Sequence, residues 1–451
     1  MPREEDVTRE ARPAPAAIRV LAVLAASLVA GLPARGADAA TRHQLSPPSR
    51  SLPAGGDDTA SGEGFAPQEI RKLLADGIAD AAMPDGRRIR LSIDERLQKD
   101  MFDLFRRFDP PYGVCVAMEP KTGRIVCLVG YRKGGEPDPW LPLKALYPAA
   151  SLIKVVTAAA ALEKGELSPS DEIAYRGGIY RITKRGLHAR NGRGVPTMSL
   201  EDAIAKSANS VFGKVTVDNV GGDVLEAYME KFGFGQRIPF ELPVEMSQAE
   251  VPRNEYDLAR TGAGFGEVYV SPLHVAMIMA AISAKGAMPA PVLVELVESG
   301  DGETLYEAEP SKWRDTVAPG TADALLRMMV KTIEAGTSRR TFGTPDRTPL
   351  LRDMEVAGKT GSLSGWTPRM RFEWFAGVAP VADARLAVAA LVVNSNRWRI
   401  KGSYVGKEAF SAYFGYPQSN PPVYRVRGKK KWKGGATKRK VRRRPRGRRG
   451  S

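Results

Sequence analysis

The sequence has few residues of the two types that most often form metal centres and oxidised scaffolds. Its 451 residues include three histidines, His43, His188 and His274, and two cysteines, Cys115 and Cys127. Three scattered histidines provide no metal-ligand spacing and no His-based catalytic triad. We therefore expect no metal and no cofactor, while two cysteines alone do not settle the redox compartment.

The two cysteines are expected to be free and buried. They flank a turn between two apolar segments, which is typical of a β-hairpin. With a four-residue loop over 120–123, Cys115 would pair with Leu128, and Cys127 with Val116. The thiols would then lie on opposite faces of the sheet, so we expect no disulfide.

Acidic residues are absent from the last part of the chain. From Arg425 onward there are fifteen Lys and Arg, against a net charge of +16 for the whole sequence. The rest is therefore close to neutral, and the pI near 9.8 does not indicate a nucleic-acid-binding body. We expect no nucleic-acid partner and a disordered basic tail over 419–451.

The N-terminal apolar run is too short to span a bilayer. Val20–Leu32 has thirteen mostly aliphatic residues, about 20 Å of helix against a hydrocarbon core of about 30 Å. Basic Arg12 and Arg19 precede it, and Ala37-Asp38-Ala39 follows it as an A-x-A cleavage pattern. Residues 1–39 are predicted to be a signal peptide, with a retained N-terminal anchor as the alternative.

Export would place the chain in the periplasm or on the outer face of a bacterial cytoplasmic membrane. There the basic tail could bind anionic phospholipid or a wall polymer, at about 1 kcal/mol per basic residue near a surface. The alternative is a solvated tail with no fixed partner.

The middle of the chain predicts a mixed fold of one large sheet and covering helices. Residues 40–65 are predicted to be a disordered linker, 66–110 a small N-terminal region and 111–418 the main domain. Strands are expected at both ends of these segments and helices between them, so the sheet would join distant segments and carry a helical insert. The expected strands are 88–93, 113–118, 124–131, 355–362, 373–378 and 386–393; the expected helices are 67–82, 94–108, 151–164, 199–206, 271–285, 321–335 and 407–414.

The segment 147–165 is predicted to be a buried helix that carries a reactive pair. Almost every residue after Ser151 is apolar or small, except Lys154. Residues three apart lie on the same helix face. Burial favours a neutral amine, which could accept the serine proton.

Two other short motifs follow the first one in a meaningful order. Ser151-Leu-Ile-Lys154 is followed by Ser207-Ala-Asn209 and then by Lys359-Thr360-Gly361. Each motif alone is weak, because caps and edge strands produce similar triplets by chance. Together they are typical of penicillin-recognising serine enzymes.

With these motifs the chain resembles the transpeptidase domain of penicillin-binding proteins over about 111–415. GVCVAMEPKTGRIVCLV is similar to the family's opening hairpin, and SLEDAIAKSANSVF to its second-motif helix pair; EWFAGVAP is similar to the strand after the third motif. The resemblance implies an α/β (α+β) fold: an antiparallel sheet covered by helices on both faces, plus an all-helical subdomain.

The resemblance also implies roles for the polar residues of the motifs. Ser151 would be the nucleophile and Lys154 the base, while Ser207 would bridge to that lysine and relay a proton to the leaving amine. Lys359 would keep Lys154 neutral by repulsion and attract a substrate carboxylate.

The remaining motif residues would bind substrate. Asn209 would bind an amide of the substrate, and Thr360 and Ser362 would offer hydroxyls to its carboxylate. Gly361 would leave room for a peptide against the strand. The oxyanion hole implied by the resemblance consists of the N–H groups of Ser151 and Ser362.

The implied activity is that of a serine D,D-transpeptidase. The substrate would be a peptidoglycan stem peptide ending in D-Ala-D-Ala, and β-lactams would acylate the same serine. Open alternatives are a D,D-carboxypeptidase, a class D-like β-lactamase, and a non-catalytic β-lactam or muropeptide sensor.

Two further features are assigned ordinary structural roles. Gly262–Gly266 has G-x-G-x-G spacing and no accompanying kinase residues, so we expect a glycine-rich cleft wall and no nucleotide site. His188 lies in a polar excursion over 176–197 and is expected to be solvated. Three aromatic residues are expected in the core: Phe372, Trp374 and Phe375.

Overall fold

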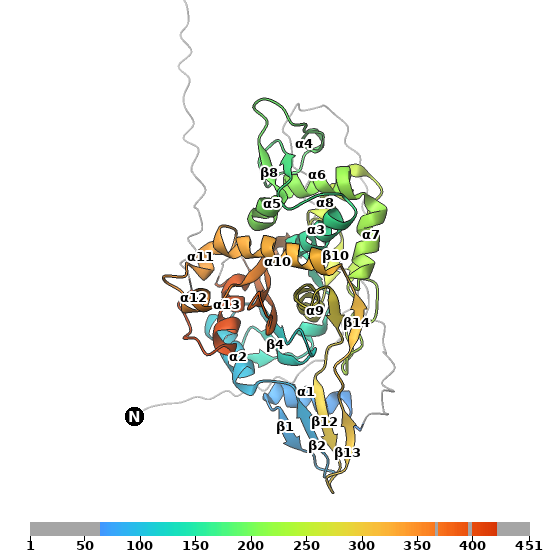
Figure 1. Ribbon diagram of the computed structural model, residues 1–451. Helices are drawn as coiled ribbons and strands as arrows, with labels where there is room; N and C mark the ends of the chain where they lie inside the picture. Colours follow the sequence, from blue (N-terminus) through green and yellow to red (C-terminus); the bar gives the residue numbers. More distant parts are fainter. Residues whose placement is uncertain (1–63, 366–368, 396–398, 422–451) are drawn as a thin grey trace, which may run out of the picture. The chain divides into compact units, whose positions relative to one another are not determined.

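The structure is a computed structural model that describes residues 64–365, 369–395 and 399–421 (Figure 1). The predicted signal peptide, nearly all of the predicted linker, and the basic tail beyond residue 421 lie outside the described residues. In the described part of the chain, no helix is both long and apolar enough to cross a membrane.

A six-stranded antiparallel sheet joins the two ends of the main domain. Its strand order is β15-β16-β17-β3-β4-β5, and β17 pairs with β3 so that Ala389 faces Val116. The predicted sheet built from distant segments is therefore confirmed. The strands are β3 Tyr112–Met118, β4 Ile125–Arg132, β5 Glu136–Pro137, β15 Ala357–Gly365, β16 Met370–Ala379 and β17 Leu386–Asn394.

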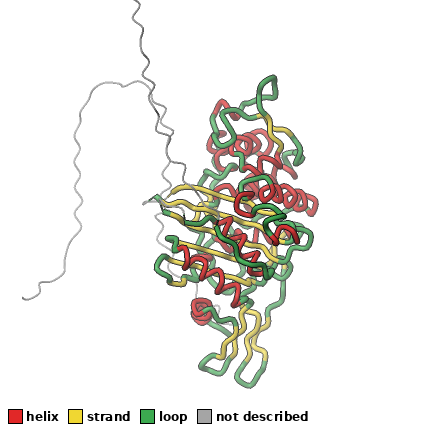
Figure 2. Tube along the Cα trace, turned by 90° about the vertical axis from the view of Figure 1, so that its left-hand side faces the viewer, coloured by secondary structure: helices red, strands yellow, loops and turns green. Residues whose placement is uncertain are grey.

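Both faces of this sheet are covered, because its strands are apolar on both sides. Val114 and Val116 face one core, whereas Cys115 and Ala117 face the other. Helix α9 (Pro272–Ser283) packs on the first face, and α13 (Gly402–Tyr413) and α2 (Glu95–Phe108) cover the second (Figures 1 and 2). The three aromatic residues expected in the core are buried there: Phe372, Trp374 and Phe375.

The cysteines are free and buried as predicted, but the predicted register of their hairpin is wrong. Cys115 pairs with Val129, and Cys127 pairs with Ala117. An irregularity between Ala117 and Met118 shifts the pairing by one residue. Both thiols consequently face the same core, and Cys127 Sγ lies 3.8 Å from the Cys115 carbonyl oxygen.

The small N-terminal region shares a sheet with the middle of the chain. The helix α1 (Pro67–Asp76) is shorter than predicted, because Gly77 ends it in a left-handed conformation with φ of 72°. The following residues form β1 (Asp80–Ala82) and β2 (Arg88–Leu91), and β2 pairs with β12 (Val294–Glu298). With β13 (Thr304–Glu307), these strands form the four-stranded sheet at the lower end of Figure 1.

The helical part holds the second motif and also contains a short strand pair. Ser199 caps α5 by accepting a hydrogen bond from the Asp202 N–H, which confirms the predicted helix start. Its elements are α4 Lys184–Leu187, α5 Leu200–Lys206, α6 Asn209–Val215, η3 Thr216–Val220, α7 Gly222–Lys231 and α8 Glu255–Gly262, with strands β7 Glu172–Ala174 and β8 Thr197–Ser199.

The remaining elements connect these parts. Helix α10 (Pro319–Glu334) packs on both α5 and β15, so it links the second motif to the third. The others are η1 Leu141–Leu143, β6 Tyr147–Pro148, η2 Ala150–Leu152, α3 Ile153–Glu163, β9 Gln248–Ala249, β10 Val268–Val270, β11 Ala287–Pro289, β14 Lys312–Asp315, α11 Arg339–Phe342 and α12 Pro349–Asp353.

Candidate active site

Ser151 lies in a tight turn just before helix α3, and not inside the single helix predicted over 147–165. Strand β6 leads into the short 3₁₀ turn η2, and the α-helix begins at Ile153. Ala150 has a φ of 50°, a left-handed conformation that L-residues other than Asn and Asp seldom adopt. The sequence gives no signal for this break, because every residue around it is apolar and compatible with a helix.

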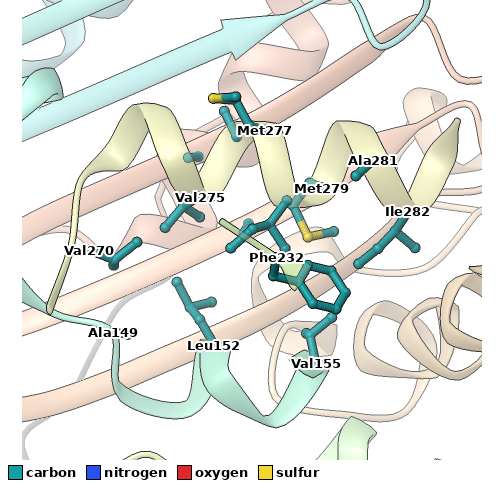
Figure 3. Packing of buried hydrophobic residues seen from close by; sticks show 14 of the residues in the cluster. Ala149, Leu152, Val155, Phe232, Val270, Val275, Met277, Met279, Ala281 and Ile282 are labelled. Atoms are coloured by element: carbon teal, nitrogen blue, oxygen red, sulfur yellow. The ribbon is translucent and has the colours of Figure 1, made fainter. Parts of the chain in front are cut away.

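A dry layer of side chains supports this turn from below. Leu152 and Val155 point toward Val275 and Met279 of α9, next to the ring of Phe232 (Figure 3). All five side chains are buried. Because protein interiors are close-packed, this layer restricts movement of the turn that holds the nucleophile.

The Lys154 amine contacts Ser151 as predicted, and two further groups complete its surroundings. Lys154 Nζ lies 2.7 Å from Ser151 Oγ, 2.9 Å from Asn209 Oδ1 and 2.5 Å from the Ala263 carbonyl oxygen. A neutral amine has two N–H donors and one lone pair. The two carbonyl oxygens match the donors, and the Ser151 hydroxyl matches the lone pair.

Burial favours this neutral form of Lys154. The side chain has no solvent exposure, and desolvation lowers its pKa well below 10.5, with the nearby charge of Lys359 adding to the effect. The arrangement is that of a base next to a nucleophile at a helix N-terminus.

Ser207 contacts a different lysine from the one expected. It ends α5 in a left-handed conformation with φ of 54°, and its hydroxyl accepts a hydrogen bond from Lys359 Nζ at 2.9 Å. The contact to Lys154 is made instead by Asn209, the first residue of α6. Asn209 therefore orients the amine, a role that the sequence analysis did not assign to it.

The third motif lies on β15, the edge strand of the six-stranded sheet. Lys359 is fully buried, and burial lowers its pKa to about 7. Its Nζ also donates to the Thr360 carbonyl oxygen at 2.8 Å. A Cβ at Gly361 would lie 3.4 Å from the Ala149 carbonyl oxygen, so this glycine lets the strand approach the turn that carries Ser151.

The hydroxyls of Thr360 and Ser362 both have protein partners that the sequence did not indicate. Thr360 Oγ1 lies 2.6 Å from Thr337 Oγ1, in the segment after α10. Ser362 Oγ donates to Glu373 Oε2 at 2.8 Å. Glu373 faces Ser362 across the β15–β16 register, a proximity that becomes visible only when the pairing of the strands is known.

The second motif also fixes an exposed aromatic residue. Asn209 Nδ2 donates to the Tyr180 carbonyl oxygen at 3.0 Å, and the Ser210 N–H donates to the Ile179 carbonyl oxygen at 3.1 Å. Tyr180 itself is 63% exposed. The predicted polar excursion is thus fastened to the active site by its backbone.

The glycine-rich segment after α8 forms a wall of the site, as the sequence analysis expected. A Cβ on Gly264 would lie 2.3 Å from the Ala150 carbonyl oxygen and 2.8 Å from the Ser151 nitrogen. Gly264 also has a positive φ of 93°, which suits glycine alone among common residues.

Gly264→Ala is therefore expected to displace the Ser151 turn. We expect acylation to fall by at least about 100-fold, because a shift of about 1 Å in a reacting group can have that effect. The unfolding free energy should fall by about 1–3 kcal/mol through overpacking. Gly192→Ala is the matched control, because a Cβ there meets no atom within 4 Å. Equal acylation rates for the two variants would contradict the close contact.

Neither histidine in the described part of the chain contacts the reactive pair. His188 Nε2 lies 3.4 Å from Glu255 Oε1 at an exposed position, as expected for a solvated side chain. His274 Nε2 lies 2.7 Å from the Phe232 carbonyl oxygen, and burial lowers the pKa of His274 to about 4. Among the described residues, no group of three or more His, Cys, Asp or Glu could hold a metal ion.

The buried Ser–Lys pair, together with a second lysine across the cleft, defines a serine enzyme of acyl transfer. The family model described as "Penicillin binding protein transpeptidase domain" matches residues 113–414, about two thirds of the sequence. The chain belongs to this family, which confirms the resemblance seen in the motifs.

Curated relatives of the family are similar over most of the described chain. The peptidoglycan D,D-transpeptidase PbpA of Mycolicibacterium smegmatis is 26% identical over 345 residues, covering 68% of each chain. The PbpA protein of Mycobacterium tuberculosis is 26% identical over 363 residues, covering 72% of this chain and 71% of its own. The prediction of a penicillin-binding serine transpeptidase of cell-wall synthesis is confirmed by these relatives and the family match.

Solved structures confirm the predicted fold class. A ceftriaxone acyl-enzyme complex of penicillin-binding protein A from M. tuberculosis has a TM-score of 0.60 at 24% identity, covering 72% of this chain and 79% of that one. Penicillin-binding protein 3 from M. tuberculosis in complex with aztreonam has a TM-score of 0.62 at 19% identity, covering 75% and 82%.

Proposed function

We propose that this chain is a D,D-transpeptidase that forms an acyl-enzyme on Ser151 with peptidoglycan stem peptides and is acylated by β-lactams at the same atom. The observation that supports the proposal most is the environment of Lys154. Two carbonyl oxygens take both N–H donors of a neutral amine, and the lone pair faces the Ser151 hydroxyl.

The acylation step follows from this arrangement. Lys154 takes the Ser151 proton while Oγ attacks the carbonyl carbon between the last two D-Ala residues. By analogy with the family, the N–H groups of Ser151 and Ser362 bind the resulting oxyanion. The C–N bond then breaks, and the leaving amine takes a proton through Ser207, whose hydroxyl is oriented because it accepts from Lys359.

The substrate would lie along the exposed edge of β15. A peptide can add to an edge strand through backbone hydrogen bonds, and Gly361 keeps the approach open. Lys359 and Thr360 would attract the terminal carboxylate, and Asn209 would hold an amide of the stem while it orients Lys154.

Resolution of the acyl-enzyme decides between the proposed activity and its alternatives. A neighbouring stem amine gives a cross-link, and water gives carboxypeptidation. The test is to incubate the protein with a stem peptide ending in D-Ala-D-Ala, with and without an amine acceptor, and to measure D-Ala and cross-linked product. We expect both products to form with the acceptor; D-Ala release without any cross-link would favour the carboxypeptidase.

Two other readings give different results in the same experiment. A β-lactamase would hydrolyse penicillin with many turnovers, whereas a penicillin-binding protein stays acylated. A non-catalytic sensor would bind penicillin covalently but release no D-Ala from the peptide.

The pH dependence of acylation should report the charge of Lys359. Burial lowers its pKa to about 7, so the charge that attracts the carboxylate is present below pH 7 and is lost above it. We expect acylation by a D-Ala thioester with a free carboxylate to decline through about pH 7, while its methyl ester lacks this decline. An identical decline for both compounds would contradict carboxylate recognition by Lys359.

Export and the division of the chain belong to the same proposal. Residues 1–39 would direct export, 40–65 would be a linker, 66–110 the small N-terminal region, 111–418 the transpeptidase domain and 419–451 the basic tail. This assignment is supported by the A-x-A pattern and by a substrate that lies outside the cytoplasmic membrane.

The basic tail is proposed to bind anionic lipid or wall polymer. Deletion of 425–451 should reduce co-sedimentation with anionic vesicles or wall fragments at low salt, because fifteen positive charges are removed. High salt should abolish the difference between the two proteins by screening. Unchanged sedimentation of the shortened chain at low salt would dismiss the tail as a tether.

A further inference from the structure

A buried carboxylate holds the hydroxyl of a third-motif residue. Ser362 Oγ donates to Glu373 Oε2 at 2.8 Å, and the two residues are direct cross-strand partners on β15 and β16. Glu373 is 4% exposed, and Arg371 forms an ion pair with its other oxygen. The carboxylate therefore keeps its charge next to the edge strand.

This contact changes what Ser362 can offer to a ligand. A serine hydroxyl has one proton and two lone pairs. While the proton lies on the bond to Glu373, the hydroxyl can only accept hydrogen bonds, and a substrate carboxylate is itself only an acceptor. The Ser362 hydroxyl and the nearby Glu373 charge would then repel that carboxylate.

Loss of the contact on ligand binding is disfavoured by burial. A buried carboxylate deprived of a hydrogen-bond donor loses stabilisation that solvent cannot replace at this exposure. Thr360 differs, because its partner Thr337 is another hydroxyl, and either one of the two can be the donor. When Thr337 donates, the Thr360 proton is free to point toward the cleft.

We infer that Glu373 is a positioning and specificity-determining residue, which withdraws the Ser362 hydroxyl from carboxylate recognition and fastens the backbone of β15 at residue 362. Recognition of the substrate carboxylate then falls to Thr360 and Lys359. This inference rests on the proposed function, in which the N–H of Ser362 belongs to the oxyanion hole.

The activity test compares two acylating compounds, a D-Ala thioester with a free carboxylate and its methyl ester. The measured quantity is the ratio of their acylation rate constants. Ser362→Ala should leave this ratio unchanged, because the hydroxyl does not donate to the carboxylate. Thr360→Val should lower the ratio. A ratio that falls in Ser362→Ala as far as in Thr360→Val would overturn the inference.

Removal of Glu373 should release the hydroxyl for ligand binding. Glu373→Ala is expected to raise the ratio several-fold, and the double variant Ser362→Ala/Glu373→Ala should lose the part of that gain due to the hydroxyl. Both variants lack the charge, so their difference isolates the hydroxyl. Equal ratios for the two would contradict its release.

The hydrogen bond itself can be tested without any activity. Ser362→Ala should lower the midpoint of thermal unfolding in the parent protein and leave it unchanged in the Glu373→Ala background. Additive effects would overturn the inference, whether or not the enzyme is acylated. A parent protein that is not acylated would count against the proposed function alone, because the unfolding comparison is decided without substrate.

Discussion

Replacement of Ser151 with alanine is expected to abolish covalent labelling by a fluorescent penicillin. The side chain provides the attacking oxygen, and Lys154 Nζ lies 2.7 Å from it. Removal of a nucleophile that acts with its base as a unit lowers turnover by about 10⁶-fold in serine hydrolases. We therefore expect the labelling rate to fall below detection, at least about 10⁴-fold under the parent.

The fold should survive this change, since Ser151 contributes one hydroxyl to a well-packed turn. An unchanged unfolding midpoint would show that loss of labelling reflects lost chemistry. Ser170→Ala is the matched control, because Ser170 is exposed and contacts only Ser168 through its hydroxyl. Labelling of Ser151→Ala at the parent rate would rule out the proposed nucleophile.

Replacement of Lys154 with methionine should have the second-largest effect. Methionine nearly preserves the volume of the side chain and removes the amine, so the Ser151 proton has no acceptor. Loss of a general base lowers rates by about 10²–10⁴-fold, and we expect the second-order acylation rate constant to fall within that range. The carbonyl oxygens of Ala263 and Asn209 would also lose a donor.

Stability and catalysis can be separated for this variant. Each unsatisfied buried acceptor costs about 1–3 kcal/mol, whereas relief from burying an ionisable amine acts in the opposite direction, so the unfolding midpoint should change little. Lys164→Met is the matched control: Lys164 ends the same helix but is exposed, and its acylation rate should equal that of the parent. A Lys154→Met variant with the parent rate would contradict the role of this amine as base.

The architecture could be predicted from the sequence wherever periodicity and motifs agree. Apolar strands at both ends of the main domain predicted a sheet of distant segments, and the order of the three motifs predicted which side chains meet. Ser151, Lys154, Asn209 and Lys359 are indeed gathered within one network of hydrogen bonds that includes Ser207.

The errors arose where the backbone departs from a regular element. The break at Ala150, with its φ of 50°, leaves no trace in an apolar run. The irregularity after Ala117 moved the hairpin register by one residue, which placed Cys115 and Cys127 on one face instead of two.

Partner choice within the site was also beyond the sequence. Spacing could bring Ser207 near a lysine but could not decide that it accepts from Lys359. The contact between Ser362 and Glu373 depends on the register of β15 against β16. The intervening residues do not encode that register in any pattern of polarity.

The central claim is that the chain works through an acyl-enzyme on Ser151. The most direct test is to incubate the protein with penicillin, digest it, and locate the added mass by tandem mass spectrometry. The account predicts one acylated peptide, with the adduct on Ser151. An adduct on any other residue, or no adduct in the folded protein, would contradict it.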